Sequence, residues 1–228
     1  MRLRSPEKIV DEMQMLKTEF GIQLFHFTDS VVNRPVEHFE ALCRELINRK
    51  LNVAWTGFFR EDSLTPQNLA LAMKAGLTAI YFSGDALTNQ GLTLLNKKLS
   101  CEDILDAAKL TAQMGILTMC HFLINLPGES RQSIMESSEM LDRLLEIHGP
   151  AGNLGAVIFN HVRLYPRAPM TQRLIRSSDL DPDTDFLYPI YHNPDKFSYV
   201  LHEFEARCHS ASVFSRLELP PFFQELAS

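Results

Sequence analysis

The apolar residues follow two alternating spacings along most of the chain. Short apolar and aromatic runs, typical of buried strands, are followed by segments in which apolar residues recur every three or four positions, typical of amphipathic helices. The predicted strands are 22–28, 52–58, 78–83, 116–125 and 155–165, and the predicted helices are 6–20, 35–50, 65–76, 100–114 and 129–148. Strand starts recur every ~26 to 40 residues, the spacing of repeated βα units in a parallel sheet. The pattern predicts a barrel or a doubly wound sheet.

Local signals mark several helix ends. Ser5-Pro6-Glu7 combines a capping hydroxyl, a first-turn proline and an early carboxylate, and Gly21 ends the same helix. Ser100 and Asp103 have the spacing of a capping box. The first element is a helix, so the predicted fold is short of one strand at its N-terminal end.

The alternation of predicted strands and helices stops after residue 170. Residues 177–194 are rich in Asp and Pro and indicate an ordered loop, whereas 195–212 predict one more helix and Pro220-Pro221 an irregular tail. We therefore expect a core over 1–170 and a C-terminal helical or irregular appendage over 171–228.

Composition narrows the class of protein. The 228 residues are 45% hydrophobic and 22% charged, with a net charge of −6, which disfavours a nucleic-acid-binding surface. Neither a run of ~20 apolar residues nor a signal peptide is present, so we expect a cytoplasmic protein without a membrane span. The four cysteines, Cys43, Cys101, Cys120 and Cys208, lack the short spacings of a zinc or iron–sulfur site.

Ligands of parallel α/β folds bind at the carboxyl ends of the strands. The polar or backbone-exposing residues there are Thr28-Asp29-Ser30, Gly57 with Arg60, Ser83-Gly84-Asp85, Asn125 through Glu129, and Arg163 through Pro166. In Leu126-Pro127-Gly128-Glu129, the glycine allows close approach of the backbone to a ligand and the glutamate begins a helix. The pattern favours a ligand site, although a tight strand-to-helix turn explains this motif as well.

Three histidines, His26, His121 and His161, fall within predicted strands. Facing one interior, they could bind a metal ion together with an acidic residue. Their spacing matches no metal motif, so satisfied core histidines are the simpler interpretation. Nucleophile-elbow, P-loop and dinucleotide-binding motifs are also absent from the sequence.

An ordered string of motifs resembles the radical S-adenosylmethionine enzymes, and the resemblance is collinear from about residue 4 to 170. The motifs are Ser5-Pro6-Glu7 with Ile9-Val10, Phe27 through Ser30, Trp55 with Arg60 and Asp62, Met73 through Gly76, Ser83 through Leu87 with Leu95-Asn96-Lys97, Phe122 through Ser130, and Arg163 through Pro166 with Ala168-Pro169. Ser83 to Leu87 and Tyr188-Pro189 further resemble the branch with an N-terminal cobalamin domain.

The resemblance implies a partial parallel (β/α)6-type barrel whose first strand and CxxxCxxC loop precede Met1. That loop binds a 4Fe–4S cluster, which cleaves S-adenosylmethionine with an electron from an external donor. In the cobalamin branch the outcome is often methyl transfer, to a small-molecule or peptide substrate that the sequence does not identify. None of the four cysteines matches the cluster ligands, so we expect the isolated chain to be inactive.

The resemblance also assigns roles to residues. Thr28, Asp29 and Ser30 would approach the amino group of the methionyl part, and Arg60 its carboxylate. Asp85, with Ser83, would bind the ribose hydroxyls.

The adenine would lie against backbone from two strands. Leu123, Asn125, Pro127 and Gly128 would line it, with Asn125 replacing the usual glycine of the family. The backbone at Val162 and Arg163 would complete this wall.

Two other functions stay open. A non-catalytic remnant could hold a nucleotide-like ligand, and a metal-dependent barrel hydrolase could use the strand histidines. Independently of the function, an exposed sheet edge where the first strand is missing would favour oligomerisation or aggregation.

Overall fold

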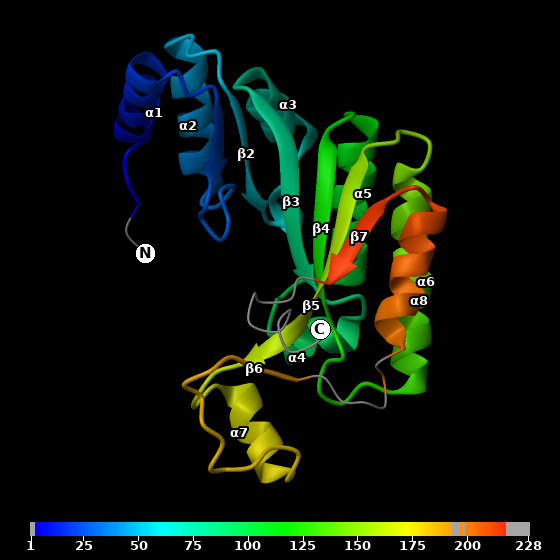
Figure 1. The fold of residues 1–228 in the computed structure, drawn as a ribbon. Coiled ribbons are helices and arrows are strands. Elements are labelled where there is room, and N and C mark those ends of the chain that lie inside the picture. Colours follow the sequence, from blue (N-terminus) through cyan, green and yellow to red (C-terminus); the bar gives the residue numbers. More distant parts are fainter. Residues whose placement is uncertain (1–2, 193–196, 198, 218–228) are drawn as a thin grey trace.

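The computed structural model describes residues 3–192, 197 and 199–217. Its elements are α1 (Pro6–Phe20), β1 (Leu24–Phe27), α2 (Val36–Asn48), β2 (Ala54–Phe59), the 3-10 helix η1 (Glu61–Ser63), α3 (Pro66–Lys74), β3 (Leu77–Asp85), α4 (Asn89–Leu94), α5 (Cys101–Gln113), β4 (Leu117–Ile124), α6 (Arg131–His148), β5 (Leu154–Leu164), α7 (Pro169–Arg176), β6 (Ile190–His192), α8 (Val200–Ser210) and β7 (Phe214–Leu217). Figure 1 shows their arrangement.

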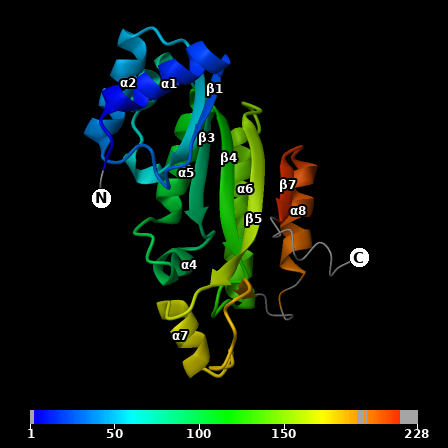
Figure 2. The same ribbon diagram turned by 60° about the vertical axis from the view of Figure 1, so that its left-hand side comes forward.

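The strands form one seven-stranded sheet in the order β1-β2-β3-β4-β5-β6, with β7 also paired to β5. All neighbours are parallel except β6, which runs antiparallel to β5. Helices α5, α6 and α8 lie on one side of the curled sheet (Figures 1 and 2). The fold is an α/β parallel half-barrel, which confirms the predicted fold class.

The helix boundaries follow the capping signals in the sequence. The Ser5 hydroxyl accepts the N–H of Lys8, and Gly21 ends α1 with φ of 71° in the left-handed region. Ser100 and Asp103 form the predicted capping box at the start of α5. These local interactions begin and end helices where the sequence predicted.

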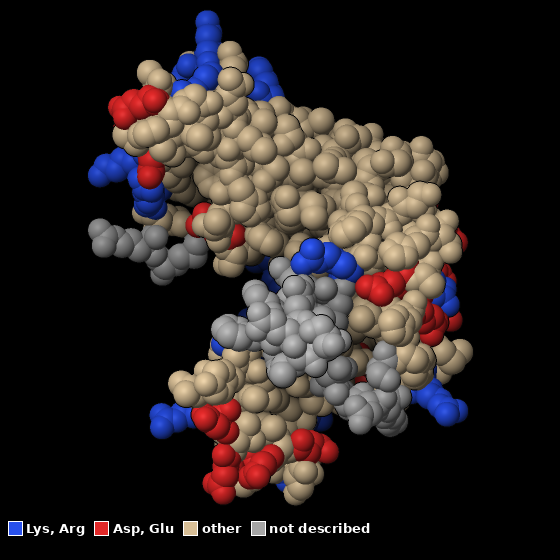
Figure 3. Space-filling model, in the orientation of Figure 1, with Lys and Arg blue, Asp and Glu red and all other residues tan. Residues whose placement is uncertain are grey.

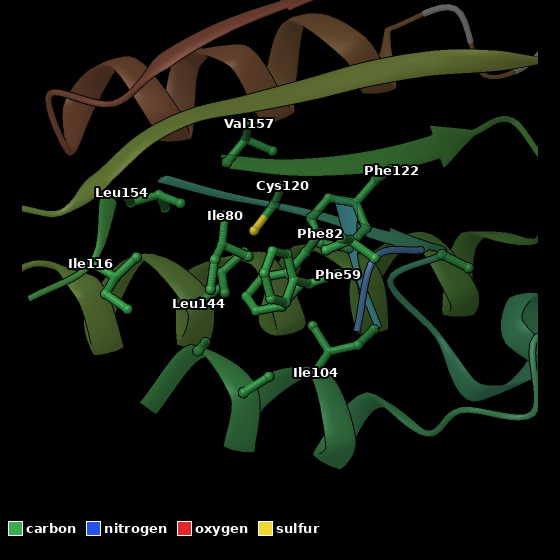
Figure 4. Packing of buried hydrophobic residues seen from close by; sticks show 14 of the residues in the cluster. Phe59, Ile80, Phe82, Ile104, Ile116, Cys120, Phe122, Leu144, Leu154 and Val157 are labelled. Atoms are coloured by element: carbon green, nitrogen blue, oxygen red, sulfur yellow. The ribbon is translucent and has the colours of Figure 1, made fainter. Parts of the chain in front are cut away.

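The hydrophobic core lies between the sheet and its helices. Phe82 of β3 and Phe122 of β4 lie in the core cluster with Ile104 of α5 and Leu144 of α6. Trp55 of β2 packs against Phe39 of α2. Each of these strand side chains is at most 1% exposed. Figure 4 shows part of this packing. Full burial of a side chain of this size contributes ~1.5 to 3 kcal/mol. Because one face of each strand is occupied in this way, the other face is left for the concave side of the half-barrel.

Five of the described elements were not predicted: η1, α4, α7, β6 and β7. The predicted helix over 195–212 is α8, and its two expected first residues lie outside the described residues, as does Pro220-Pro221. After α8 the chain returns as β7 beside β5. The C-terminal part thus extends the sheet as well as adding a helix.

The segment from α7 to β6 forms a lobe beyond the carboxyl ends of the strands (Figure 1). Figure 3 shows acidic side chains gathered on this lobe, and the exposed Asp179, Asp181, Asp183 and Asp185 follow α7 in the sequence. None of the helices in the described ranges is long and apolar enough to cross a membrane.

β1 is an edge strand in the described sheet, where it pairs with β2 alone. Leu24, at the start of β1, is 64% exposed. The sheet edge expected from the sequence is therefore present on this side.

Candidate functional site

The predicted site residues all lie at the edge of the sheet where the parallel strands end. Thr28, Asp29 and Ser30 follow β1, Arg60 follows β2, Ser83 and Asp85 end β3, Leu123 to Gly128 end β4 and enter the next turn, and Val162 and Arg163 lie near the end of β5. The fold brings these segments to one end of the half-barrel because neighbouring strands are parallel.

Thr28, Asp29 and Ser30 are exposed in the turn after β1. The neighbouring Asn33 is fully buried, and its side-chain oxygen accepts the N–H of Arg60 at 2.8 Å. Asn33 also donates to the Arg60 carbonyl at 2.9 Å. The amide therefore joins the turn after β1 to the end of β2.

The Arg60 guanidinium is already engaged by protein groups. Its Nε lies 3.0 Å from Asp62, and its Nη2 donates to the carbonyls of Lys97 and Lys98 at 2.7 and 2.9 Å. The side chain is 16% exposed. A ligand carboxylate at Arg60 would share the guanidinium with these partners.

Asp85 has a strained backbone and a charged neighbour. Its φ is 65°, in the region that residues with a side chain rarely adopt. Its carboxylate lies 2.6 Å from the Lys97 ammonium, with side chains 30% and 21% exposed. Ser83 alternates with buried neighbours on the same half-exposed face of β3. The carboxylate is thus accessible but already paired with a cation.

Glu61 was missed in the sequence. It is 4% exposed, and its Oε1 is buried without a hydrogen-bond partner. Burial raises the pKa of its carboxyl from 4.5 to about 7, opposed by the charges of Lys97 and Arg60 and increased by that of Asp85. The available signal was the run Arg60-Glu61-Asp62, three charged residues directly after a predicted buried strand.

The turn after β4 is built from unusual backbone conformations. Asn125 has φ of 56° and is 1% exposed, and its carbonyl accepts a hydrogen bond from Nδ1 of His192 at 2.6 Å. Gly128 has φ of 88°, with open space where a Cβ would stand. Burial raises the pKa of the Glu129 carboxyl, which accepts backbone N–H groups from Asn125 and Leu126. Asn125 adopts the left-handed conformation that makes glycine favourable here.

Two cavities flank this turn and share its residues Leu126 to Glu129. One, of about 230 Å³, reaches Thr88 and Gln90 near α4 and Arg173 of α7. The other, of about 500 Å³, lies against the α7–β6 lobe and includes His192. The lobe therefore forms a wall of the site that sequence reasoning had treated as a loop.

Val162 and Arg163 pair with β6, opposite His192 and Tyr191. The antiparallel partner uses backbone groups of this part of β5. The Arg163 guanidinium carbon lies 5.0 Å from the centre of the Tyr165 ring. The part of β5 that was expected to line the adenine is thus paired with β6 in a two-stranded antiparallel ribbon.

The concave face carries a cluster of rings below the polar rim. His26, Phe58, Tyr81 and His121 contact one another with centroids 5.1 to 6.4 Å apart. Nδ1 of His26 also lies 2.7 Å from the Thr56 hydroxyl. Over the described residues, no three His, Cys, Asp or Glu side chains are placed to hold a metal ion, so nothing here supports the histidine-based hydrolase.

The four cysteines do not fit an iron–sulfur cluster. Cys43, Cys101, Cys120 and Cys208 lie on α2, α5, β4 and α8, and burial raises the pKa of each thiol. A cluster is bound by thiolates that converge on it. No set of cluster ligands is found in the described part of the chain.

Comparison with known proteins identifies the family of the chain. Residues 1–141 match the Radical SAM superfamily. The chain is 30% identical over 145 residues to the anaerobic magnesium-protoporphyrin IX monomethyl ester cyclase of Rubrivivax gelatinosus, covering 61% of this chain and 25% of that protein. It is 26% identical over 151 residues to the cytidylyl-2-hydroxyethylphosphonate methyltransferase of Streptomyces wedmorensis, covering 62% and 27%. The chain thus spans about a quarter of these relatives.

Solved structures show the same fold. The radical S-adenosylmethionine methyltransferase TsrM of Kitasatospora setae, with cobalamin and a [4Fe-4S] cluster bound, superposes with a TM-score of 0.66 at 22% identity, over 90% of this chain and 41% of that chain. The cobalamin-dependent enzyme OxsB gives 0.58 at 15% identity, over 83% and 33%. Cobalamin-dependent radical enzymes are therefore structural neighbours. Since the superfamily match covers most of the chain, from before α1 into α6, this protein belongs to the radical S-adenosylmethionine superfamily.

Proposed function

We propose that this chain is the S-adenosylmethionine-binding core of a cytoplasmic radical enzyme that transfers a methyl group with the help of cobalamin. The observation that carries the proposal is the Asp85 carboxylate at the end of β3, inside the superfamily match and on the rim above the concave face. A carboxylate there suits a ribose diol, because each hydroxyl can donate to one of its oxygens. The structure fits the nucleoside part of the cofactor.

The neighbouring residues have complementary tasks in this proposal. Thr28, Asp29 and Ser30 bind the methionyl ammonium, and Arg60 binds the carboxylate while Asp62 holds its guanidinium in place. Ser83 assists Asp85. Exposure of the turn after β1 leaves these groups open to a ligand.

The adenine lies in this proposal against Leu123, Asn125, Pro127 and Gly128, with the backbone at Val162 and Arg163 opposite. When bound, S-adenosylmethionine supplies a sulfonium whose carbon–sulfur bond is cleaved on one-electron reduction. The ring cluster on the concave face faces the reaction partner and excludes water from it. In the complete enzyme an external donor supplies the electron.

Asp85→Asn tests the nucleoside site. We expect binding of S-adenosylhomocysteine, measured by titration calorimetry, to weaken by roughly 10- to 100-fold, as for loss of a hydrogen bond to a charged group. Asp106→Asn, a matched change on the exposed face of α5, leaves affinity unchanged. Equal affinity of Asp85→Asn and the unsubstituted chain would refute the assignment.

A non-catalytic binding module is the second candidate, because the cysteines do not converge. Anaerobic reconstitution with iron, sulfide and a reductant tests the enzyme against the module. Iron incorporation with cleavage of S-adenosylmethionine refutes the module and shows that these cysteines do bind a cluster, whereas tight binding of the ligand with neither result favours the module.

A further inference from the structure

Glu61 occupies a place where a carboxylate has no evident structural use. It begins η1, directly after β2, and its orphaned Oε1 lies 3.6 Å from where a Cβ on Gly84 would stand. Gly84 immediately precedes Asp85. The buried carboxyl therefore lies against the backbone of the strand end that carries the rim carboxylate.

The charged groups around Glu61 come from several elements. Asp85 and Lys97 act on it from β3 and from the segment after α4, and Arg60 acts from the end of β2. On β4, the charge of Glu61 contributes to the raised pKa of the Cys120 thiol. The contact from α5 is apolar, since Ile104 packs beside Gly84. Asp103, which directly precedes Ile104, accepts hydrogen bonds from the N–H and hydroxyl of Ser100 in the helix cap.

Only one of the two nearby cations is free to change partner. Arg60 is fixed by Asp62 and by the carbonyls of Lys97 and Lys98. Those two carbonyl bonds also anchor the backbone of Lys97 and Lys98. Within the described part of the chain, the Lys97 side chain makes one ion pair, with Asp85. The Lys97 ammonium is thus a cation on a flexible stem, beside one carboxylate that it binds and a second that has an orphaned oxygen.

We propose that Glu61 is the alternate partner of Lys97: when a ribose diol takes Asp85, the Lys97 ammonium turns from Asp85 to Glu61, and Glu61 releases its proton to solvent. This inference deepens the proposed function and rests on ribose binding at Asp85. Without Glu61, freeing Asp85 would leave Lys97 unpaired near a buried site, which is costly. Glu61 is in this scheme a positioning residue, because it acts on the ligand only through Lys97.

The decisive experiment needs no ligand. The Glu61 pKa is measured from the carbon-13 shift of its side-chain carboxyl, assigned by the signal missing in Glu61→Gln. Asp85→Asn removes the present partner of Lys97, as a bound diol would. We expect this substitution to lower the Glu61 pKa by roughly one unit or more, as for a carboxyl that gains a nearby cation.

Lys97→Gln distinguishes a change of partner by Lys97 from the simple loss of repulsion between Asp85 and Glu61. Removing Asp85 relieves like-charge repulsion in either background, but the ammonium can turn to Glu61 only when Lys97 is present. We expect Asp85→Asn to shift the Glu61 pKa far less in the Lys97→Gln background. Equal shifts in both backgrounds would overturn the proposal. Asp106→Asn is the matched control and leaves the Glu61 pKa unchanged.

A second arm connects the exchange to the ligand. Calorimetric titration with S-adenosylhomocysteine near pH 6.5, in two buffers of different ionisation enthalpy, counts protons released on binding. We expect proton release from the unsubstituted chain and none from Glu61→Gln, which also binds more weakly. Absence of binding refutes the proposed ribose site. The pKa measurements on Asp85→Asn, with and without Lys97→Gln, then still decide whether Lys97 changes its partner to Glu61. Binding with equal proton release in both proteins refutes the role of Glu61.

Discussion

Glu61→Gln should make the ligand-free protein more stable at alkaline pH and leave it almost unchanged at acidic pH. Burial raises the pKa of this carboxyl in the folded chain to about 7, against 4.5 in the unfolded chain. Between these values the unfolded chain loses the proton that the folded chain keeps, so the free energy of unfolding falls as pH rises. Above pH 7 both states are ionised and the loss is complete.

The size of the effect follows from the two pKa values. The shift is 7 − 4.5 = 2.5 pH units, and each unit corresponds to ~1.36 kcal/mol, so the full loss is about 3 kcal/mol. Part of the loss has already occurred at pH 5, because the unfolded carboxyl is mostly ionised there. Between pH 5 and pH 8 the remaining loss is roughly 2.5 kcal/mol. Glutamine does not ionise, so the variant avoids this loss.

Urea unfolding followed by circular dichroism at pH 5, 6, 7 and 8 measures the effect. The quantity of interest is the difference in unfolding free energy between variant and parent, because contributions from other titrating groups cancel in it. Glu139→Gln, an exposed change on α6, is the matched control and shows no pH-dependent difference. A Glu61→Gln difference that is the same at pH 5 and pH 8 would show that Glu61 is not held protonated by burial.

Three further predictions concern the scaffold. The Asn153 amide donates to backbone carbonyls of α5 and of the residue before β4 at 2.9 and 2.8 Å, so Asn153→Ala should lower the unfolding free energy by ~2 to 5 kcal/mol in urea titrations. Gly76 has φ of 100°, and a Cβ there would lie 2.0 Å from the Val53 carbonyl oxygen, whereas Gly115 has φ of 68° with open space. Gly115→Ala should lower the unfolding free energy by ~1 to 2 kcal/mol, and Gly76→Ala should lower it by several times as much. Thermal melts of the two variants measure this difference. Burial lowers the pKa of His148, so the unfolded chain takes up a proton first and stability falls as pH drops below 6.5; in urea titrations His148→Gln should flatten that fall.

Sequence reasoning located the elements whose signals are local. Ser5, Gly21 and Ser100 set helix ends through interactions within a few residues of themselves. It missed α4 and β6 because elements of six and three residues are too short for a hydrophobic period to show. The predicted alternation of strands and helices stops after residue 170, but Pro169 is the first residue of α7, a position that proline favours.

The positions of the predicted strand ends located the candidate site, but not the contacts between its side chains. Parallel strands bring their carboxyl ends together, so the segments after β1 to β5 could be found from the strand pattern alone. The pairing of Lys97 with Asp85 could not be found in this way. The two residues are separated by α4, and only the folded chain brings Lys97 back to the end of β3. Burial of Glu61 likewise depends on the close approach of Gly84 and Ile104, which no local pattern encodes.

Trp55 gives the protein a built-in optical probe. It is the single tryptophan of the chain, fully buried, with its indole N–H bonded to the Ala75 carbonyl at 3.0 Å and its ring stacked on Phe59. Its side chain lies on the helix-covered face of β2, opposite the concave face. Tryptophan emission therefore reports whether α2 and α3 stay packed on the sheet, and a ligand that changes it has moved the scaffold rather than quenched the ring by contact.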